Sequence, residues 1–306
     1  DFYPLCIEPV VLERMVNNSI VVTGDSGAIN VMSYYIDPAD PSNEGPYGNQ
    51  IFNKFATPEF KKFAEKTREY YLAGFIDPAM TNTGTSNDAR QAAQLAGKYL
   101  IGTQSYSYGY ETAASAARGI EVAFVPTTPP YVDTTSSQGA MFAISSVSKN
   151  PERAMMFLNL LNTDPYLMTL LNYGIEGVHY DLTAEGLVKF NPEARSTYQP
   201  WTNGVGNITL LPPLEGQSTD FVEDFKAYYG AAKSTPVLGF VFNLEDVESE
   251  MGAIANVSAE YAFALMSGAA DPAEKLDEFI KSMNGAGIQK VIDEANMQLQ
   301  DFLASK

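Results

Sequence analysis

The chain has very little cysteine and histidine. Its 306 residues include one cysteine, Cys6, and one histidine, His179. A single cysteine excludes an internal disulfide, so a core or partly exposed free thiol is expected. A single histidine with no cysteine or second histidine nearby is a poor metal ligand, and we interpret it as a hydrogen-bonded turn residue. Phosphate loops and dinucleotide fingerprints are also absent, so no metal and no cofactor are expected.

Positive charge is scarce as well. There are 19 Lys and Arg against 37 Asp and Glu, a net charge of −18, and no basic run is longer than a pair. Binding to phosphate requires clustered Lys and Arg, so nucleic acid is not an expected partner. No apolar run is long enough to span a bilayer. The residues before Cys6 also lack the small side chains of a lipoprotein processing site.

Capping and spacing signals predict strands that alternate with helices. Thr57 followed by Pro58 and Glu59 starts one helix, which Gly74 ends. Further elements are expected as a helix from Ser86 or Asn87 to Gly97, a strand at 99–103, a helical stretch at 112–117 and a strand at 122–125. Such alternation is typical of an α/β lobe with an at least partly parallel sheet.

The second half of the chain is predicted to be richer in helix. An apolar run at 140–145 favours a buried strand, and Asn150 and Pro151 then start a helix with an apolar stripe. The stripe consists of Met155, Leu158 and Leu161, and Thr163 or Asp164 with Pro165 caps the next helix. Three long helices follow at 246–266, 272–283 and 286–303.

Several motifs, in this order, resemble a known family. They are "VAFVPTTPP", "AMFAISSVSKNPERAMMFLNLL" and "YGIEGVHY", and they resemble the extracellular solute-binding lipoproteins of ABC importers, family 1-like. From about 171 to 306 the chain resembles the C-terminal domain of unknown function of a clostridial-type subset. The marks of that domain are "GFVFNLEDVESEMGAIANV", "ALMSGAADPAEKLDEFI" and "GAGIQKVIDEANMQLQDFL".

This resemblance implies an α/β, periplasmic-binding-protein-like fold, type II-like, with two lobes, a hinge and a helix-rich C-terminal part. Residues 1–124 would form the second lobe, 125–172 would return to the first lobe, and 173–306 would form the C-terminal lobe and helical tail. The first lobe would begin in a segment that precedes this chain, and that segment would cover the apolar side chains of 139–172. Hinge segments are expected near 125–130 and 171–177.

The resemblance also implies capture of a small solute, expected to be a carbohydrate or oligosaccharide, and its delivery to ABC permease subunits by hinge closure. The protein would be an extracellular, cell-surface lipoprotein whose lipid anchor lies outside this chain. A secreted carbohydrate-active hydrolase and a surface adhesion or scaffold protein remain the alternatives. An enzyme is not expected, because the tetrad at 24–27 lacks the G-x-S-x-G frame and the single histidine lies far from it.

Three segments hold the candidate ligand-binding residues. The first is the loop after the strand at 99–103, where Gln104, Tyr106 and Tyr108 fall at the carboxyl end of a strand, the usual place for ligands in α/β sheets. The family's loop here supplies an aromatic residue that stacks on the ligand, which the resemblance assigns to Tyr106 or Tyr108. Surface tyrosines that close a loop are the alternative interpretation.

The other two segments are less specific. Glu176 lies between Gly174 and Gly177, so a turn could present it to a cleft, or the turn could be purely structural. Trp201 lies among loop-forming residues and could stack on a ligand or cover a core. The acidic stretch at 37–44 could suggest calcium, but its spacing does not match an EF-hand loop and its prolines favour a solvated turn.

Overall fold

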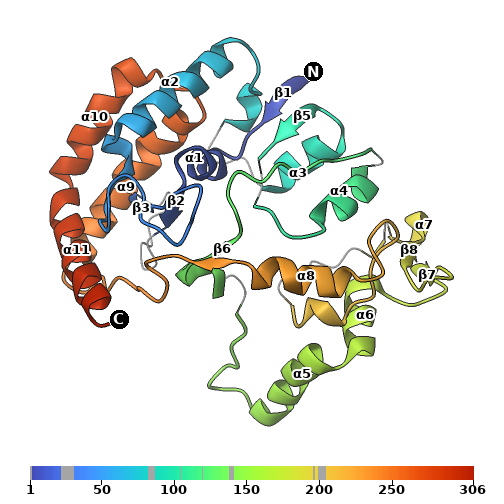
Figure 1. Cartoon of the computed structure of the whole chain (residues 1–306). Helices are drawn as coiled ribbons and strands as arrows, with labels where there is room; N and C mark the ends of the chain where they lie inside the picture. Colours follow the sequence, from blue (N-terminus) through green and yellow to red (C-terminus); the bar gives the residue numbers. More distant parts are fainter. Residues whose placement is uncertain are drawn as a thin grey trace. The chain divides into compact units, whose positions relative to one another are not determined.

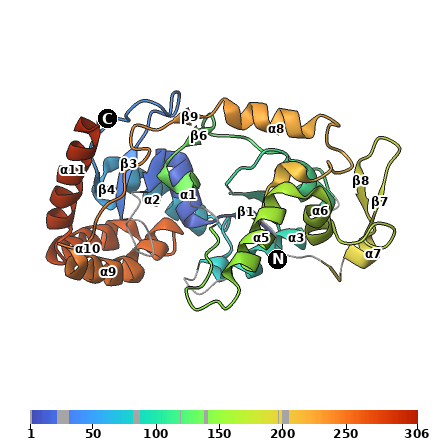
Figure 2. The same cartoon turned by 90° about the horizontal axis from the view of Figure 1, so that it is seen from below.

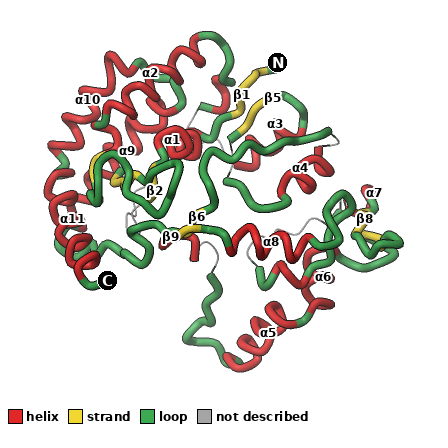
Figure 3. The backbone as a smooth tube through the Cα atoms, in the orientation of Figure 1, coloured by secondary structure: helices red, strands yellow, loops and turns green. Residues whose placement is uncertain are grey.

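The computed structural model describes residues 2–21, 31–81, 87–103, 105–118, 120–137, 141–195, 197–198 and 205–306. The chain divides into two compact units. Unit 1 comprises Asp1–Tyr106, Phe124–Thr135 and Ala232–Lys306, and unit 2 comprises Ser107–Ala123 and Ser136–Ala231. In both units helices are the main regular elements and the strands are short (Figure 3).

Unit 1 combines short strands with long helices. Its strands are β1 (Tyr3–Cys6), β2 (Ser19–Val21), β3 (Met32–Tyr35), β4 (Phe52–Asn53), β5 (Tyr99–Gly102), β6 (Tyr131–Val132) and β9 (Lys233–Ser234). Its helices are α1 (Pro9–Asn17), α2 (Pro58–Leu72), α3 (Asn87–Leu95), α9 (Glu248–Met266), α10 (Pro272–Gly285) and α11 (Ile288–Ala304), with 3-10 turns η1 (Lys54–Ala56) and η2 (Pro78–Met80). A further 3-10 turn, η3 (Thr134–Ser137), spans the boundary between the units.

Unit 2 is built mainly from shorter helices. It contains α4 (Tyr110–Arg118), α5 (Pro151–Thr163), α6 (Pro165–Tyr173), α7 (Pro192–Arg195), the 3-10 turn η4 (Ile208–Leu210) and α8 (Phe221–Gly230). Its strands β7 (Tyr180–Leu182) and β8 (Val188–Phe190) form an antiparallel pair.

The sheets of unit 1 are partly parallel, as the sequence predicts. Strands β1 and β5 pair in parallel with Leu5 opposite Ile101, and β6 pairs in parallel with β9. Strands β2, β3 and β4 form an antiparallel sheet in that order. Parallel strands need a long crossover, which the segment between β1 and β5 provides with α1, α2 and α3.

The core of unit 1 lies between the β2–β3–β4 sheet and the C-terminal helices. Helix α9 packs against α1, α2, α10 and α11 (Figure 1), and Figure 2 shows α9 and α10 side by side. Fully buried side chains from distant parts of the sequence meet here, among them Met32, Phe55, Phe60, Ala262 and Phe279. The tail predicted to be helical is therefore part of the unit 1 core.

Local capping signals explain where several helices begin. The Thr57 hydroxyl accepts a hydrogen bond from the Phe60 amide at 3.2 Å, and the Asp164 carboxylate accepts one from the Leu167 amide at 3.1 Å. Asp271 caps α10 in the same way, and in each case proline follows the cap. Asn150 precedes α5 but makes no side-chain capping bond.

Two predicted strands are wrong. Residues 122–125 and 141–145 are irregular in the structure, although both are rich in apolar side chains. A strand requires a partner, and no described strand pairs with either segment. The apolar composition of the two segments predicted buried, paired strands, but the described structure shows neither segment as a strand.

Apolar side chains of the segment around α5 are largely exposed. Met141, Met155 and Met156 are 75%, 58% and 66% exposed, whereas Leu161 is buried. An exposed apolar patch of this kind is unusual on a monomeric surface. Of the five side chains that the sequence expects to require a cover, Met141 and Met155 are exposed, Ile144 and Leu158 are half-buried, and Leu161 is buried.

The boundaries of the two units differ from those of the predicted lobes. Residues 107–123 group with unit 2, and 171–177 lies inside unit 2, whereas the last passage of the chain from unit 2 to unit 1 follows Ala231. The units are defined by contacts within this chain. The assignment of 1–124, 125–172 and 173–306 to the lobes of a larger protein stays a prediction.

An ion pair joins α9 to α11, and it leads to a prediction about the pH dependence of stability. Lys290 Nζ lies 2.6 Å from Glu250 Oε1, and Ser249 Oγ donates to Glu250 Oε2 at 2.8 Å. Lys290 first, and Ser249 second, lower the pKa of Glu250 to about 2 from its ordinary 4.5. This depressed pKa stabilises the fold above pH 4.5, and the contribution is lost as the pH falls through 2.

Replacing Lys290→Met should raise the pKa of Glu250 well above 2, toward 4.5, because the largest cause of the shift is removed. An NMR titration of the Glu250 carboxyl carbon measures this pKa. Lys290→Arg, which keeps the charge, is the control and should leave the pKa low. A pKa that stays near 2 in Lys290→Met would assign the shift to other neighbours.

Candidate functional site

The loop that follows β5 places one tyrosine in each unit. Tyr106 is the last residue of this part of unit 1, and its ring lies 5.5 Å from that of Phe124 in the same unit. Tyr108 belongs to unit 2. The sequence predicts that both tyrosines lie in a ligand site, and the structure gives them different neighbours.

Tyr108 packs on an aromatic face of α8. Phe221, Phe225, Tyr228 and Tyr229 occupy positions i, i+4, i+7 and i+8 of this helix, which places them on one side. The Tyr108 ring centre lies 5.5 Å from that of Phe221, 6.4 Å from that of Phe225 and 5.4 Å from that of Tyr228. We call these five residues the Tyr108 cluster.

Backbone geometry fixes the loop against α8. The Tyr108 amide donates to the Tyr229 hydroxyl at 3.3 Å, and the Ser107 hydroxyl lies 3.3 Å from the same oxygen. Gly109 follows with φ of 78°, and a Cβ atom there would overlap the Phe221 ring. A glycine is therefore required where the loop enters α4.

The rings of the Tyr108 cluster are not part of a sealed core. Tyr108, Phe221, Phe225 and Tyr228 are half-buried, and Tyr229 is 39% exposed. Burial, and to a smaller extent the neighbouring Tyr229 and Glu111, raise the pKa of Tyr228. Hence its hydroxyl remains a neutral hydrogen-bond donor and acceptor at physiological pH.

Glu111, in the first turn of α4, is near enough to Tyr228 of this cluster to raise the pKa of its hydroxyl. Its Oε2 atom is buried and has no hydrogen-bond partner among the described residues. A buried carboxylate oxygen without a donor is costly unless a ligand or water satisfies it. Aromatic faces next to a carboxylate acceptor match a sugar, which has C–H faces and hydroxyl edges.

The sequence analysis missed Glu111 and the residues of α8. The aromatic spacing in FVEDFKAYYG was a usable signal, because it predicts one helix face with four rings. Nothing in the sequence indicated that this face meets Tyr108, which lies more than a hundred residues earlier.

Glu176 lies in an exposed turn of unit 2. Among the described residues it forms no hydrogen bond or ion pair with the Tyr108 cluster; its backbone forms a bridge with Tyr180. His179 Nδ1 accepts the Ile175 amide at 3.0 Å, so the prediction of a hydrogen-bonded turn histidine is confirmed. Gly174 has φ of 89° and packs directly on the His179 ring.

Two candidate residues, Gln104 and Trp201, lie outside the described residues, as does the tetrad at 24–27. Cys6 is a buried free thiol, in agreement with the sequence, and burial is the main reason that its pKa is raised.

The acidic stretch at 37–44 forms a turn in which Asp37 accepts the Ala39 amide and Asp40 accepts from Ser42. Asp40 also pairs with Lys233 at 2.9 Å. Across the described ranges, no group of three His, Cys, Asp or Glu side chains is arranged to hold a metal ion, and no helix has the length and apolar character needed to cross a bilayer.

Residues 236–304, which include α9, α10 and α11, match a family described as a domain of unknown function, DUF3502. A curated relative from Streptococcus pneumoniae, named carbohydrate ABC transporter substrate-binding protein, is 29% identical over 260 residues. The match covers 84% of this chain and 52% of that protein, so the chain spans about half the length of the relative.

Solved structures similar to this chain are also solute-binding proteins. The N-glycan transport solute-binding protein NgtS of Streptococcus pneumoniae, in complex with Man1GlcNAc, superposes with a TM-score of 0.82 and 26% identity. The alignment covers 99% of this chain and 65% of that one. An ABC-transporter-associated solute-binding protein of Bifidobacterium longum infantis, described as binding HMO, has a TM-score of 0.52 and 16% identity over 99% of this chain and 65% of its own.

The second structure is too distant to show more than the fold, whereas NgtS agrees with this chain in both fold and sequence. The predicted resemblance to solute-binding proteins of ABC importers is therefore confirmed, and the chain has the fold of a periplasmic solute-binding protein with a DUF3502 domain at 236–304.

Proposed function

We propose that this chain is part of the extracellular solute-binding component of an ABC transporter, which captures a carbohydrate or oligosaccharide and delivers it to the permease. The observation that carries the proposal is the match to NgtS across 99% of this chain, in a structure with Man1GlcNAc bound. Its sugar class makes oligosaccharides of mannose and N-acetylglucosamine the first candidates for the ligand here.

The Tyr108 cluster supports a carbohydrate ligand. Half-buried rings of Tyr108 and α8 offer apolar faces, and Glu111 offers a buried acceptor that lacks a donor. In this proposal a sugar ring stacks on the cluster while one of its hydroxyls donates to Glu111 Oε2. Glu176 and Trp201 remain proposed ligand contacts from the sequence, together with Gln104 and Tyr106.

Hinge closure is the proposed mechanism of capture. A ligand that bridges the two lobes of the whole protein favours the closed state by its additional contacts there, and the permease recognises that state. Residues 125–130 lie between two passages of the chain from one unit to the other, which suits a hinge.

The same proposal places the protein outside the cell, at the outer face of the cytoplasmic membrane, with a lipid anchor outside this chain. It binds its ligand without transforming it. Incubation with Man5GlcNAc and chromatography of the products tests this point: unchanged glycan is expected, and released sugars would instead support the hydrolase alternative.

Replacing Tyr108→Ala should weaken oligosaccharide binding by about 1–3 kcal/mol, which is roughly a 5- to 150-fold loss in affinity, because a stacking ring is removed from the site. Isothermal titration with Man1GlcNAc and Man5GlcNAc, on the protein that carries this chain, measures the change. The fold should be retained, since Tyr108 is only half-buried.

Tyr166→Ala is the matched control, because Tyr166 is a 75% exposed tyrosine of the same unit. Its affinity should equal that of the unmodified protein. Equal affinity in Tyr108→Ala would remove the cluster from the site. Testing Tyr106→Ala separately shows which of the two loop tyrosines contacts the ligand. Trp201 is the chain's single tryptophan, so a change in its fluorescence on saturation with ligand would report that Trp201 contacts the ligand.

A further inference from the structure

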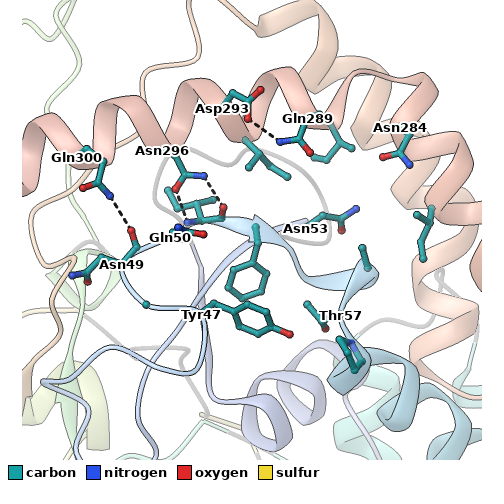
Figure 4. A pocket seen from close by; sticks show the side chains of 18 residues that line it. Tyr47, Asn49, Gln50, Asn53, Thr57, Asn284, Gln289, Asp293, Asn296 and Gln300 are labelled. Carbon is teal, nitrogen blue, oxygen red and sulfur yellow. Dashed lines mark hydrogen bonds between the residues drawn. The ribbon is translucent and has the colours of Figure 1, made fainter.

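A concave surface lies wholly within unit 1. It is a groove of about 920 Å³ with one wall from α10 and α11 of the DUF3502 domain and the other from residues 47–58 (Figure 4). Binding sites for small ligands are typically of this size. The Tyr108 cluster belongs to unit 2, so the groove shares no residue with it.

The polar lining of the groove is dominated by carboxamides. Three of them occupy one side of α11 in a row, at Gln289, Asn296 and Gln300. Gln300 Nε2 donates to the Asn49 carbonyl at 3.0 Å, so the two walls are joined at one end. Figure 4 shows Asn49 and Gln50 opposite α11, with Asn284 farther along the groove.

Two amides are available to a ligand. The side chains of Gln50 and Asn284 are exposed and make no hydrogen bond with the described residues. An amide offers two donors and an acceptor, a pattern that matches the neighbouring hydroxyls of a sugar. The lining also includes apolar side chains, among them the half-buried Phe52 and Ile280, which suit the C–H faces of a sugar ring.

Charge excludes several other ligands. Asp293 is the single charged residue that lines the groove, and it already accepts a hydrogen bond from Gln289 at 2.8 Å. With no Lys or Arg in the lining, the groove offers no partner for a phosphate or carboxylate. A neutral ligand is therefore favoured.

A peptide that pairs as an added strand is also disfavoured. Asn296 Oδ1 accepts the Ile51 amide at 2.8 Å, and Asn296 Nδ2 donates to the Ile51 carbonyl at 2.8 Å. This side chain occupies the backbone groups that a strand would use, and β4 beside it already pairs with β3. The remaining polar groups of the groove are side chains.

We propose that this groove is a second binding site, for a neutral oligosaccharide, and that the DUF3502 domain supplies one of its walls. Gln50 and Asn284 hydrogen-bond the hydroxyls, and apolar side chains of the lining contact a ring face. Binding here is independent of the site proposed at Tyr108, and it gives the domain of unknown function a direct role in glycan contact.

The test uses the protein that carries this chain, labelled with ¹⁵N, and titrates it with Man5GlcNAc, maltopentaose and, separately, the uncharged capped peptide of five alanines. The side-chain amide signals of Gln50 and Asn284 should shift with either oligosaccharide and not with the peptide. In the double variant Gln50→Ala/Asn284→Ala, the affinity reported by the Gln289 side-chain signal should fall at least tenfold.

Two controls separate this site from the one at Tyr108. Met297→Ala, on α11 but outside the groove, should bind like the unmodified protein. Tyr108→Ala should leave the groove signals and their affinity unchanged even where it weakens the other site. Absence of any shift at Gln50 and Asn284 with 10 mM of either oligosaccharide, a shift with the peptide alone, or unchanged affinity in the double variant would overturn the proposal.

Discussion

Replacing Glu13→Ala is expected to destabilise unit 1 by about 3–5 kcal/mol, because it leaves the buried ammonium of Lys54 without its carboxylate. Glu13 and Lys54 are 0% and 1% exposed, and Lys54 Nζ lies 2.8 Å from Glu13 Oε2. Asn17 Nδ2 donates to Glu13 Oε1 at 3.1 Å, and Ser19 Oγ donates to Oε2 at 3.4 Å. The carboxylate therefore joins α1, β2 and η1 at one point.

Urea unfolding, followed by circular dichroism, measures this effect as a lower midpoint of the transition that reports unit 1. The double variant Glu13→Leu/Lys54→Met should be much less destabilised than Glu13→Ala, since it leaves no buried charge unpaired. Lys66→Ala breaks an exposed pair with Glu69 and should cost less than about 1 kcal/mol. A Glu13→Ala midpoint close to that of Lys66→Ala would contradict the argument.

The pair also illustrates what the sequence does not reveal. Glu13 and Lys54 lie 41 residues apart, and each has the appearance of an ordinary surface residue in an acidic chain. Their burial depends on α1 being packed against α2 and α9, which is a long-range property of unit 1. Neither residue was identified from the sequence.

Several helix starts were predicted because their signals are local, although α1 and α8 were not predicted. Proline after Thr57, Asp164 and Asp271 marked helix starts that the structure confirms, each with a side-chain capping bond. Strands were predicted less well, since a strand is stable only with a partner elsewhere in the chain. The strand predicted at 99–103 forms as β5 and pairs with β1, whereas 122–125 and 141–145 have no described partner strand.

The candidate site shows the same limit. Position after a strand drew attention to the loop of Tyr106 and Tyr108, but it did not indicate that Tyr108 contacts rings of α8 or that Tyr106 contacts Phe124. Contacts between segments that far apart follow from the fold alone. The amide groove is similar, because Asn296 and Ile51 are 245 residues apart.

Replacing Phe279→Ala should destabilise unit 1 by about 3–5 kcal/mol, the usual cost of removing a buried phenyl ring and leaving a cavity. Phe279 of α10 is 0% exposed. Its ring stacks on Tyr261 of α9, with centres 5.4 Å apart and planes at 14°, and lies 4.8 Å from the Phe55 ring of η1. The side chain thus connects the DUF3502 helices to the N-terminal part of unit 1.

Thermal and urea unfolding measure the loss, and Phe279→Leu, which keeps most of the apolar volume, should lie between Phe279→Ala and the unmodified protein. Met297→Ala is the control for a large apolar side chain of the same domain that is 55% exposed, and it should change stability by no more than about 0.5 kcal/mol. If Phe279→Ala lowered stability no more than Met297→Ala, α10 would not be packed on the rest of unit 1 as described. Because the ring contacts both α9 and η1, a full loss in Phe279→Ala would agree with a core in which the domain of unknown function packs on the N-terminal part of unit 1.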